Sequence, residues 1–163
     1  MSIGSRLSEL GLSLPEAVKP AFQYAAVVQS GDQAFVSGQL PKTGGDHGLL
    51  HYGKVDGEVS LEQGRECARL CVLHALSVLV HTLGEGALDR IEQVVQVTGF
   101  VAASPDFYGH PKVIDGASEL LVEIFGERGR HARAAVGVSS LPRNAPVEIA
   151  FIFRLSQSSG VAS

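Results

Sequence analysis

Apolar residues recur at helical spacing in two stretches of the chain. The first begins at Ser60, where Gln63 completes a capping box, and it ends at Gly84. The second covers residues 111–125 and stops at Gly126. Because each stretch keeps its apolar residues on one side, each predicts an amphipathic helix that packs on another layer of the protein.

Strands are predicted where β-branched and aromatic residues gather or alternate with small and polar ones. A hairpin is expected around a Ser-Gly-Asp turn, and a long strand fills the space between the two helices. Two more strands follow the second helix and are joined by a Leu-Pro turn. The predicted strands cover residues 24–29, 33–40, 90–103, 131–139 and 147–154.

The remaining segments predict less regular structure. Residues 5–14 have the pattern of a short amphipathic helix, stopped by Pro15. The glycine-rich segment 41–59 has no period and is typical of a loop, with a short edge strand at 49–55.

The order strand, strand, helix, strand, helix, strand, strand predicts an α+β fold, with a mixed sheet and two main helices on one face. No repeat or linker divides the chain. We therefore expect a single domain over residues 1–163, with an N-terminal extension at 1–20 and a flexible tail at 156–163. The uncovered face of the sheet must then meet water or a partner subunit.

Two charged side chains lie in the last two predicted strands, where charges rarely stand unless they are paired or used. Alternation puts Arg133 beside Ala135 on the strand face that points away from the helices, next to a gap lined by small residues. If the Leu141-Pro142 turn makes the two strands neighbours, Glu148 reaches the same space. A guanidinium beside such a gap suits a carboxylate ligand, and a nearby carboxylate can hold water or move a proton. An ion pair between Arg133 and Glu148, within the chain or across a subunit boundary, is the structural alternative.

Composition narrows the classes of partner. Of the 163 residues, 45% are hydrophobic and 18% charged, as in ordinary globular domains, and the net charge of −4 gives no basic surface for nucleic acid or an anionic membrane. No run of about 18 uncharged apolar residues predicts a membrane helix, and the N-terminus lacks the apolar core of a secretory signal. Cys67 and Cys71 have a spacing that disfavours a disulfide, so a reducing cytoplasm is the expected location.

The histidines and the glycine-rich loop do not predict a metal or nucleotide site. His47 and His51 have i,i+4 spacing, but they lie in a loop with no third ligand in view. His74 and His81 are expected at an interface or in solvent, and His131 at the surface. The glycines of GDQAFVSGQLPKTGG lack the Gly-Lys-Ser order of a phosphate loop. We therefore expect no cofactor and no metal.

Three segments, taken in order, resemble one known family. They are SGQLP at 37–41, VVQVTGFVAASPDF in and after the long strand, and HARAAVGVSSLPRNAPVEIAFIF at 131–153. Together they are similar to the RidA/YjgF family of reactive-intermediate deaminases, historically labelled endoribonuclease L-PSP, from Tyr24 to Leu155. The resemblance implies a chorismate-mutase-like two-layer fold and a homotrimer. In that trimer the bare sheet faces would pack into a central barrel, with ligand clefts between neighbouring subunits.

The resemblance also implies an activity and a site. Characterised members of the family hydrolyse 2-imino acids to 2-keto acids and ammonia. Arg133 matches their carboxylate-binding arginine, and Glu148 matches the glutamate that orients water. Tyr24, Ser37 and Gly38 match residues that line the same cleft. The expected ligand is a small 2-imino or 2-keto carboxylic acid.

The chain departs from the family pattern in three places. Ala135 stands where members often carry a cysteine that lines the cleft, and Pro111 lies near the position of an expected asparagine. The segment between Asp106 and Arg133 is longer than usual, as in a longer bacterial subgroup. Two alternatives to the deaminase therefore stay open: a trimer that binds or senses small carboxylates without turnover, and an endoribonuclease, which the acidic net charge disfavours.

Overall fold

The helices and strands follow one another in the predicted order. The computed structural model describes residues 1–17, 23–44 and 48–157. The elements are α1 (Ile3–Glu9), β1 (Val27–Ser30), β2 (Gln33–Gln39), β3 (Lys42–Thr43), β4 (Gly48–Leu49), α2 (Leu61–Leu83), β5 (Ile91–Ala102), α3 (His110–Phe125), β6 (Ala132–Val138) and β7 (Val147–Leu155). Short 3-10 helices occupy Leu88–Arg90, Gly126–Gly129 and Pro142–Asn144.

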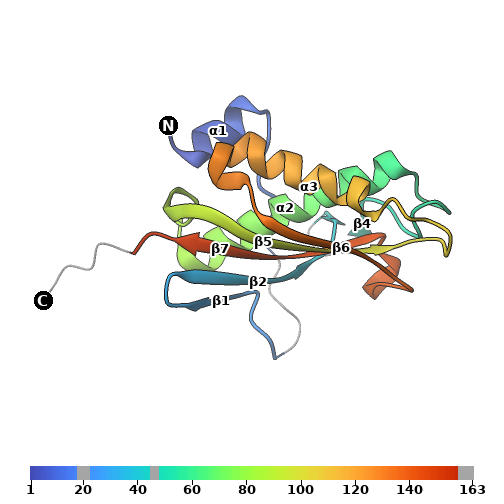
Figure 1. Ribbon diagram of the computed structural model, residues 1–163. Coiled ribbons are helices and arrows are strands. Elements are labelled where there is room, and N and C mark those ends of the chain that lie inside the picture. The colour runs from blue at the N-terminus through green and yellow to red at the C-terminus, as the bar shows by residue number, and fades with distance from the viewer. Residues whose placement is uncertain (18–22, 45–47, 158–163) are drawn as a thin grey trace, which may run out of the picture.

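Five of the strands form a mixed sheet in the order β1-β2-β7-β5-β6. Neighbouring strands run antiparallel except β5 and β6, which are parallel and are connected through α3. Helices α2 and α3 lie together on one face of this sheet, and α1 lies against α3 on the side away from the strands (Figure 1). The predicted α+β fold, with two main helices on one face of a mixed sheet, is confirmed.

Local signals explain where the two long helices begin and end. The capping box of α2 is formed: Gln63 N donates to Ser60 Oγ over 3.1 Å, and Ser60 N donates to Gln63 Oε1 over 2.9 Å. Gly84 and Gly126 follow the last turns of α2 and α3 with φ values of 93° and 62°, which side chains with a Cβ rarely tolerate. Both predicted helices are thus confirmed with their caps.

The core lies between the sheet and helices α2 and α3. Its largest fully buried side chains are Leu76, Leu79, Ile91, Ile114, Leu120, Leu121, Ile149, Phe151, Phe153 and Leu155. Burying one such side chain contributes roughly 1.5–3 kcal/mol. Among the described residues, α2 alone is long and apolar enough to cross a membrane, but more than half of that stretch is buried here, so this is weak support for a span.

Two local predictions are wrong in their bounds. Helix α1 covers Ile3–Glu9 rather than 5–14, because Gly11 takes a φ of 68° just after its last turn. The edge strand expected at 49–55 does not form. β3 and β4 make a separate two-stranded sheet instead, and Val55 joins only isolated bridges.

The last two strands are not neighbours, contrary to the prediction from the Leu-Pro turn. β5 lies between β6 and β7 and pairs with both. The reason is the crossover: α3 returns the chain to the outer side of β5, where β6 runs parallel to it. The segment around Pro142–Asn144 must then pass the end of β5 before β7 can pair on the other side.

The two faces of β6 are also reversed from the prediction. Arg133 pairs in register with Val97, whose side chain is fully buried beneath the helices, so Arg133 points toward α3. The apolar set Ala132, Ala134 and Val136 occupies the open face, and Val136 is 43% exposed. Because these residues are apolar, the helices were expected to cover them. Within one chain, the face that carries them is uncovered.

The open face of the sheet carries several apolar side chains. One row across the strands runs through Val28, Phe35, Ile152, the polar Gln96 of β5 and Ala132. Val28 and Phe35 are 53% and 41% exposed. Apolar side chains gathered on one uncovered face indicate an interaction surface.

Candidate functional site

Glu148 stands at the start of β7 on the open face of the sheet, over the backbone of Gly38. A Cβ added to Gly38 would lie 3.0 Å from Glu148 Cγ and nearer still to its carboxylate, so glycine is what allows this approach. The register between β2 and β7 shifts between Val36 and Gln39, which is a bulge at this point. Two of the predicted site residues are thus brought against each other.

The Glu148 carboxylate is half-buried and makes no hydrogen bond or ion pair within the described part of the chain. Burial raises the pKa of Glu148 above its ordinary value. A partly desolvated acid without a partner disfavours folding, and such groups cluster at functional sites.

Ser37 precedes Gly38 on β2 and is bonded to the segment that carries Tyr24. Ser37 Oγ donates to the carbonyl of Ala25 over 2.7 Å, and Ser37 N donates to the carbonyl of Ala26 over 2.9 Å. These bonds hold the segment that carries Tyr24 against β2, while Tyr24 itself is 55% exposed. We call Tyr24, Ser37, Gly38 and Glu148 the glutamate half-site.

Arg133 lies on the edge strand β6 and is held by α3. Its Nη1 donates to Asp115 Oδ1 over 2.8 Å and to Ser118 Oγ over 3.1 Å, and the side chain is 25% exposed. Nε and Nη2 form no hydrogen bond with any described residue. Within the chain, Arg133 is therefore ion-paired with Asp115 and not with Glu148.

A hydrogen-bond chain continues from Ser118 to His131. The Nδ1 atom of His131 lies 2.6 Å from the Gly129 carbonyl, and Nε2 lies 2.9 Å from Ser118 Oγ. Because a carbonyl only accepts, Nδ1 carries the proton and the Ser118 hydroxyl donates to Nε2. Burial lowers the pKa of His131, the Gly129 carbonyl partly opposes this, and the charge of Arg133 lowers it further. His131, expected at the surface, is half-buried instead.

Ala135 follows Arg133 on the same strand face and pairs in register with Gly99. Ala135 is half-buried. Pro111 is exposed in the first turn of α3. The side chains from α3 that reach the arginine are Asp115 and Ser118, one and two helical turns further on. We call Arg133, Ala135, Asp115, Ser118 and His131 the arginine half-site.

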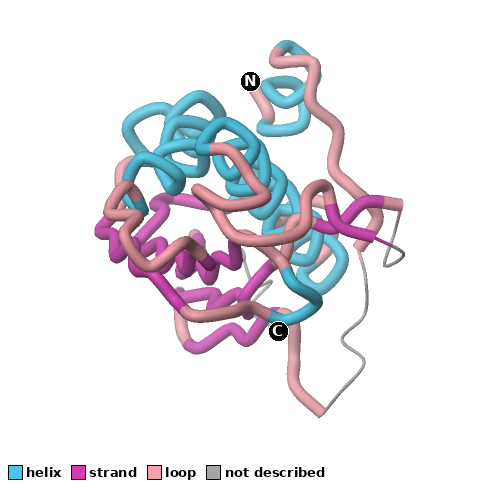
Figure 2. The backbone as a smooth tube through the Cα atoms, turned by 90° about the vertical axis from the view of Figure 1, so that its right-hand side faces the viewer, coloured by secondary structure: helices cyan, strands magenta, loops and turns pink. Residues whose placement is uncertain are grey.

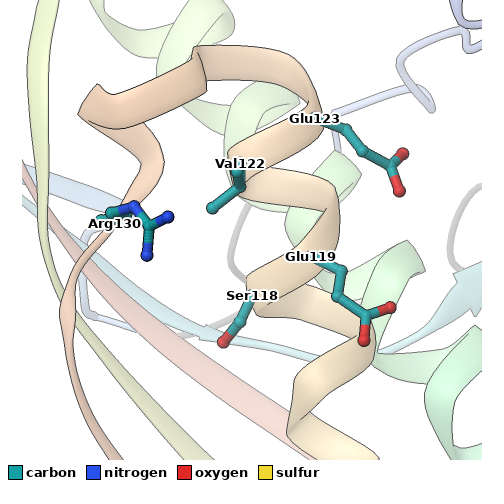
Figure 3. A pocket seen from close by; sticks show the side chains of 5 residues that line it. All are labelled: Ser118, Glu119, Val122, Glu123 and Arg130. Carbon is teal, nitrogen blue, oxygen red and sulfur yellow. The ribbon is translucent and has the colours of Figure 1, made fainter.

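An open hollow adjoins the arginine half-site between α3 and the segment before β6. It has a volume of about 480 Å³ and is lined by Ser118, Glu119, Val122, Glu123 and Arg130. Figure 3 shows Ser118 and Val122 pointing toward Arg130, whereas the carboxylates of Glu119 and Glu123 point to the other side of α3. Glu119 is paired there with Arg65 over 2.7 Å.

The two half-sites do not meet within one chain. Arg133 is in register with Val97 of β5, whereas Glu148 is in register with Phe100 of the same strand. Residues 97 and 100 point to opposite faces of a strand, so Arg133 and Glu148 point to opposite sides of the sheet. The space that the sequence predicted these two side chains to share is absent from the single chain. Figure 2 shows the long helices on one side of the strands of the main sheet.

Two residues that the site uses were missed from the sequence. Asp115 and Ser118 stand three residues apart on α3 and so share one side of the helix. That spacing was visible in the sequence. What hid their role was the reversed face of β6, which turned Arg133 away from α3 in the prediction.

The other histidines and the cysteines do not build a site. His74, expected at an interface or in solvent, is buried, with Nε2 2.9 Å from the Lys42 carbonyl. His51 is paired with Glu66 over 3.2 Å. Both cysteines are free and buried, as expected, and burial raises the pKa of Cys67 to about 12.

Metal-ligating side chains do not gather in threes anywhere in residues 1–17, 23–44 and 48–157. His47, and most of the tail expected to be flexible, lie outside these described residues.

Comparison with known proteins gives consistent matches over nearly the whole chain. The family model described as "YjgF/chorismate_mutase-like, putative endoribonuclease" matches residues 4–155. Protein TCP17 of Trypanosoma cruzi is 41% identical over 155 residues, which are 94% of each of the two proteins.

Two solved structures are similar in both sequence and fold. The protein Atu1372 of Agrobacterium tumefaciens, of unknown function, has a TM-score of 0.86 and 41% identity, covering 94% of this chain and 92% of its own. A protein of Shewanella oneidensis described as a "putative endoribonuclease" has a TM-score of 0.88 and 34% identity, covering 95% of this chain and 100% of its own.

Proposed function

Because the chain belongs to the YjgF/chorismate-mutase-like family, we propose that it hydrolyses small 2-imino acids to 2-keto acids and ammonia, in a cleft built by two copies of the chain. The observation that carries the proposal is the half-buried Glu148 carboxylate, which lies over Gly38 without a partner among the described residues. An acid kept in this condition is ready to bind water and accept a proton.

The separation of the two half-sites supports a shared cleft. Arg133 lies at one edge of the sheet and Glu148 on the open face beyond β5, so association is the way for both to contact one small ligand. The exposed apolar face, with Val28, Phe35 and Val136, gives a reason for copies of the chain to associate. The family resemblance makes a homotrimer the expected assembly.

The arginine half-site suits the acid end of the substrate. Nε and Nη2 lie on one edge of the guanidinium and can hold both oxygens of a carboxylate, a charge-assisted contact worth about 1.5–3 kcal/mol. TdcF of E. coli has been solved with bound serine, which carries such a carboxylate. At 19% identity and a TM-score of 0.61, that likeness to the present chain extends to the fold alone.

The reaction needs only water and proton transfers. The oxygen of a water bound to Glu148 attacks C2 of the imine while Glu148 takes a proton from the water. The C=N electron pair moves to the nitrogen of the protonated imine, which becomes a neutral amine. Glu148 then gives its proton to that amine and takes the proton of the new hydroxyl as the C–N bond breaks, so that ammonia leaves, the carbonyl forms, and the last proton passes from Glu148 to solvent. The raised pKa of Glu148 brings it closer to the operating pH, which favours both transfers.

The first experiment measures imine hydrolysis directly. A pyridoxal-phosphate dehydratase generates 2-iminobutanoate from threonine in situ, and the rate of its disappearance is compared with the spontaneous rate. Arg133→Ala and Glu148→Gln are each expected to remove the acceleration. The matched control is Arg130→Ala, which removes an exposed arginine paired with Glu127 close to the same strand. Wild-type rates in Arg133→Ala or Glu148→Gln would overturn the assignment.

A mixing experiment tests whether the cleft is shared. The two inactive variants are unfolded together and refolded at equal ratio. If Arg133 of one copy serves Glu148 of the next, about a quarter of the clefts regain both residues by random assortment in a ring. If each chain held a complete site, no mixture would regain activity, and the shared cleft would be wrong.

The description of the family favours a second candidate, RNA cleavage. The same wild-type preparation is therefore incubated with single-stranded RNA. This alternative would be selected if the wild type cleaves RNA but does not hydrolyse the imine, and if Glu148→Gln abolishes the cleavage. If the protein binds 2-oxobutanoate but neither cleaves RNA nor hydrolyses the imine, it is a carboxylate-binding protein.

A further inference from the structure

We propose that Asp115 makes the arginine half-site selective for monocarboxylates over dicarboxylates. This inference rests on the proposed function for the class of ligand, but it does not depend on turnover. Asp115 and Ser118 act as positioning and specificity residues: they hold one nitrogen of Arg133 and leave a single edge of its guanidinium for the ligand.

The hydrogen bonds of Arg133 determine which edge the ligand takes. A guanidinium has five N–H groups, of which Nη1 carries two. Asp115 Oδ1, at 2.8 Å, and Ser118 Oγ, at 3.1 Å, use both. The end-on edge, which pairs Nη1 with Nη2, is therefore occupied, and the Nε and Nη2 edge is the one that can bind a carboxylate with two parallel bonds.

The partners of Nη1 are themselves fixed in place. Asp115 and Ser118 project from adjacent turns of α3, and the Ser118 hydroxyl donates to His131 Nε2 over 2.9 Å. His131 is anchored in turn by the Gly129 carbonyl at 2.6 Å. Each donor in this chain faces one acceptor, so the orientation of the guanidinium is set before a ligand arrives.

The charges around the site give the selectivity. Arg133 contributes one positive charge, and Asp115 cancels it at contact distance. The neighbouring charged side chains are already paired, Glu119 with Arg65 and Arg130 with Glu127. Within the arginine half-site, a bound monocarboxylate therefore leaves one uncompensated negative charge. A dicarboxylate leaves two, and Asp115 repels the second one at short range.

The test compares two four-carbon acids that differ in one group. 2-Oxobutanoate ends in a methyl group where oxaloacetate carries a second carboxylate. Both are titrated into the full-length protein by calorimetry at low ionic strength, because salt screens exposed charges. Wild-type protein should prefer 2-oxobutanoate by at least about tenfold, as expected for one unfavourable charge contact in a partly exposed site.

Asp115→Asn keeps the shape and the hydrogen-bond acceptor but removes the charge. We expect it to reduce the preference about tenfold, chiefly through tighter binding of oxaloacetate. The matched control is Glu119→Gln, which removes the same charge one helical turn away and should leave the preference unchanged. Asp115→Ser is a second variant that removes the same charge. It is used if thermal melting shows that the amide of Asp115→Asn disturbs folding.

The outcomes separate this inference from the proposed function. In one outcome, Arg133→Ala abolishes binding of 2-oxobutanoate, but Asp115→Asn does not alter the preference for 2-oxobutanoate over oxaloacetate. This result overturns the role of Asp115 and leaves the ligand site intact. An equal gain in affinity for both acids makes Asp115 a simple competitor for the guanidinium and also overturns it. If Arg133→Ala binds both acids as the wild type does, the carboxylate site itself fails, and this inference fails with it.

Discussion

Replacing Gly38 with alanine tests the glutamate half-site without touching a catalytic group. The new Cβ would lie 2.9 Å from Glu148 Cδ and 3.0 Å from Cγ, whereas ordinary contacts begin at 3.4 Å. The carboxylate must therefore move away, by roughly 1 Å at its nearer oxygen. A displacement of this size at a reacting group costs on the order of 100-fold in rate.

The same substitution should hardly affect folding. Gly38 does not have a positive φ, so alanine fits its backbone, and the atoms it displaces belong to the end of a flexible side chain. We expect the melting temperature to stay within a few degrees of the wild-type value, which for a domain of this size corresponds to about 1 kcal/mol. Loss of activity in a stable protein would place the effect at Glu148.

The assay is the dehydratase-coupled hydrolysis of 2-iminobutanoate, followed as kcat/KM. Gly86→Ala is the matched control, because a Cβ at Gly86 meets nothing within 4 Å. Gly38→Ala with undiminished kcat/KM would refute the reasoning, since it would show that the position of the Glu148 carboxylate does not matter. A large fall in melting temperature would instead show that Gly38 supports the fold.

Three further predictions follow from single contacts. Burial raises the pKa of Glu148 above 4.5, so its ionisation disfavours the folded state as pH rises through that range. Glu148→Gln should therefore have a higher melting temperature than wild type at pH 7, and this difference should vanish below about pH 4.5. A difference in melting temperature that does not depend on pH would contradict this. Gly116→Ala would place a Cβ 3.0 Å from Arg65 Cα and force α2 and α3 apart. The free energy of unfolding, measured in urea, should fall by about 1–3 kcal/mol. An unchanged midpoint of urea unfolding would show that the helices can separate freely. Val136→Lys changes an exposed position on the open face and should abolish association in light scattering while leaving the helical content intact; an unchanged mass would move the contact elsewhere.

The sequence predicted elements that depend on local interactions. Ser60 and Gln63 lie three residues apart, and Gly84 and Gly126 end their helices, so helices α2 and α3 were predictable from neighbouring residues alone. The long strand β5 followed from its β-branched residues. Pairing between strands depends on the path of the chain, which the eight residues between β6 and β7 do not reveal. A Leu-Pro turn can close a hairpin or carry the chain past an intervening strand.

The reversed faces of β6 have a different cause. Alternation shows which residues share a face, but it does not show what covers that face. Ala132, Ala134 and Val136 resemble residues that pack on helices, and they lie on the open side. Arg133 was placed away from α3 for the same reason, and its contacts with Asp115 and Ser118 were hidden. An apolar face in one chain predicts burial, and that burial can require a second chain.

Two unfavourable features of the single chain lie on the same side of the sheet. The open face exposes Val28, Phe35 and Val136 to water, and Glu148 is half-buried there without a partner. In the proposed assembly one event changes both: covering the face removes apolar surface from water, and the arriving copy brings Arg133 and its ligand toward the acid. Association would then be favourable because of the same residues that perform the chemistry. A substitution on the open face should therefore alter the mass of the particle and its activity together.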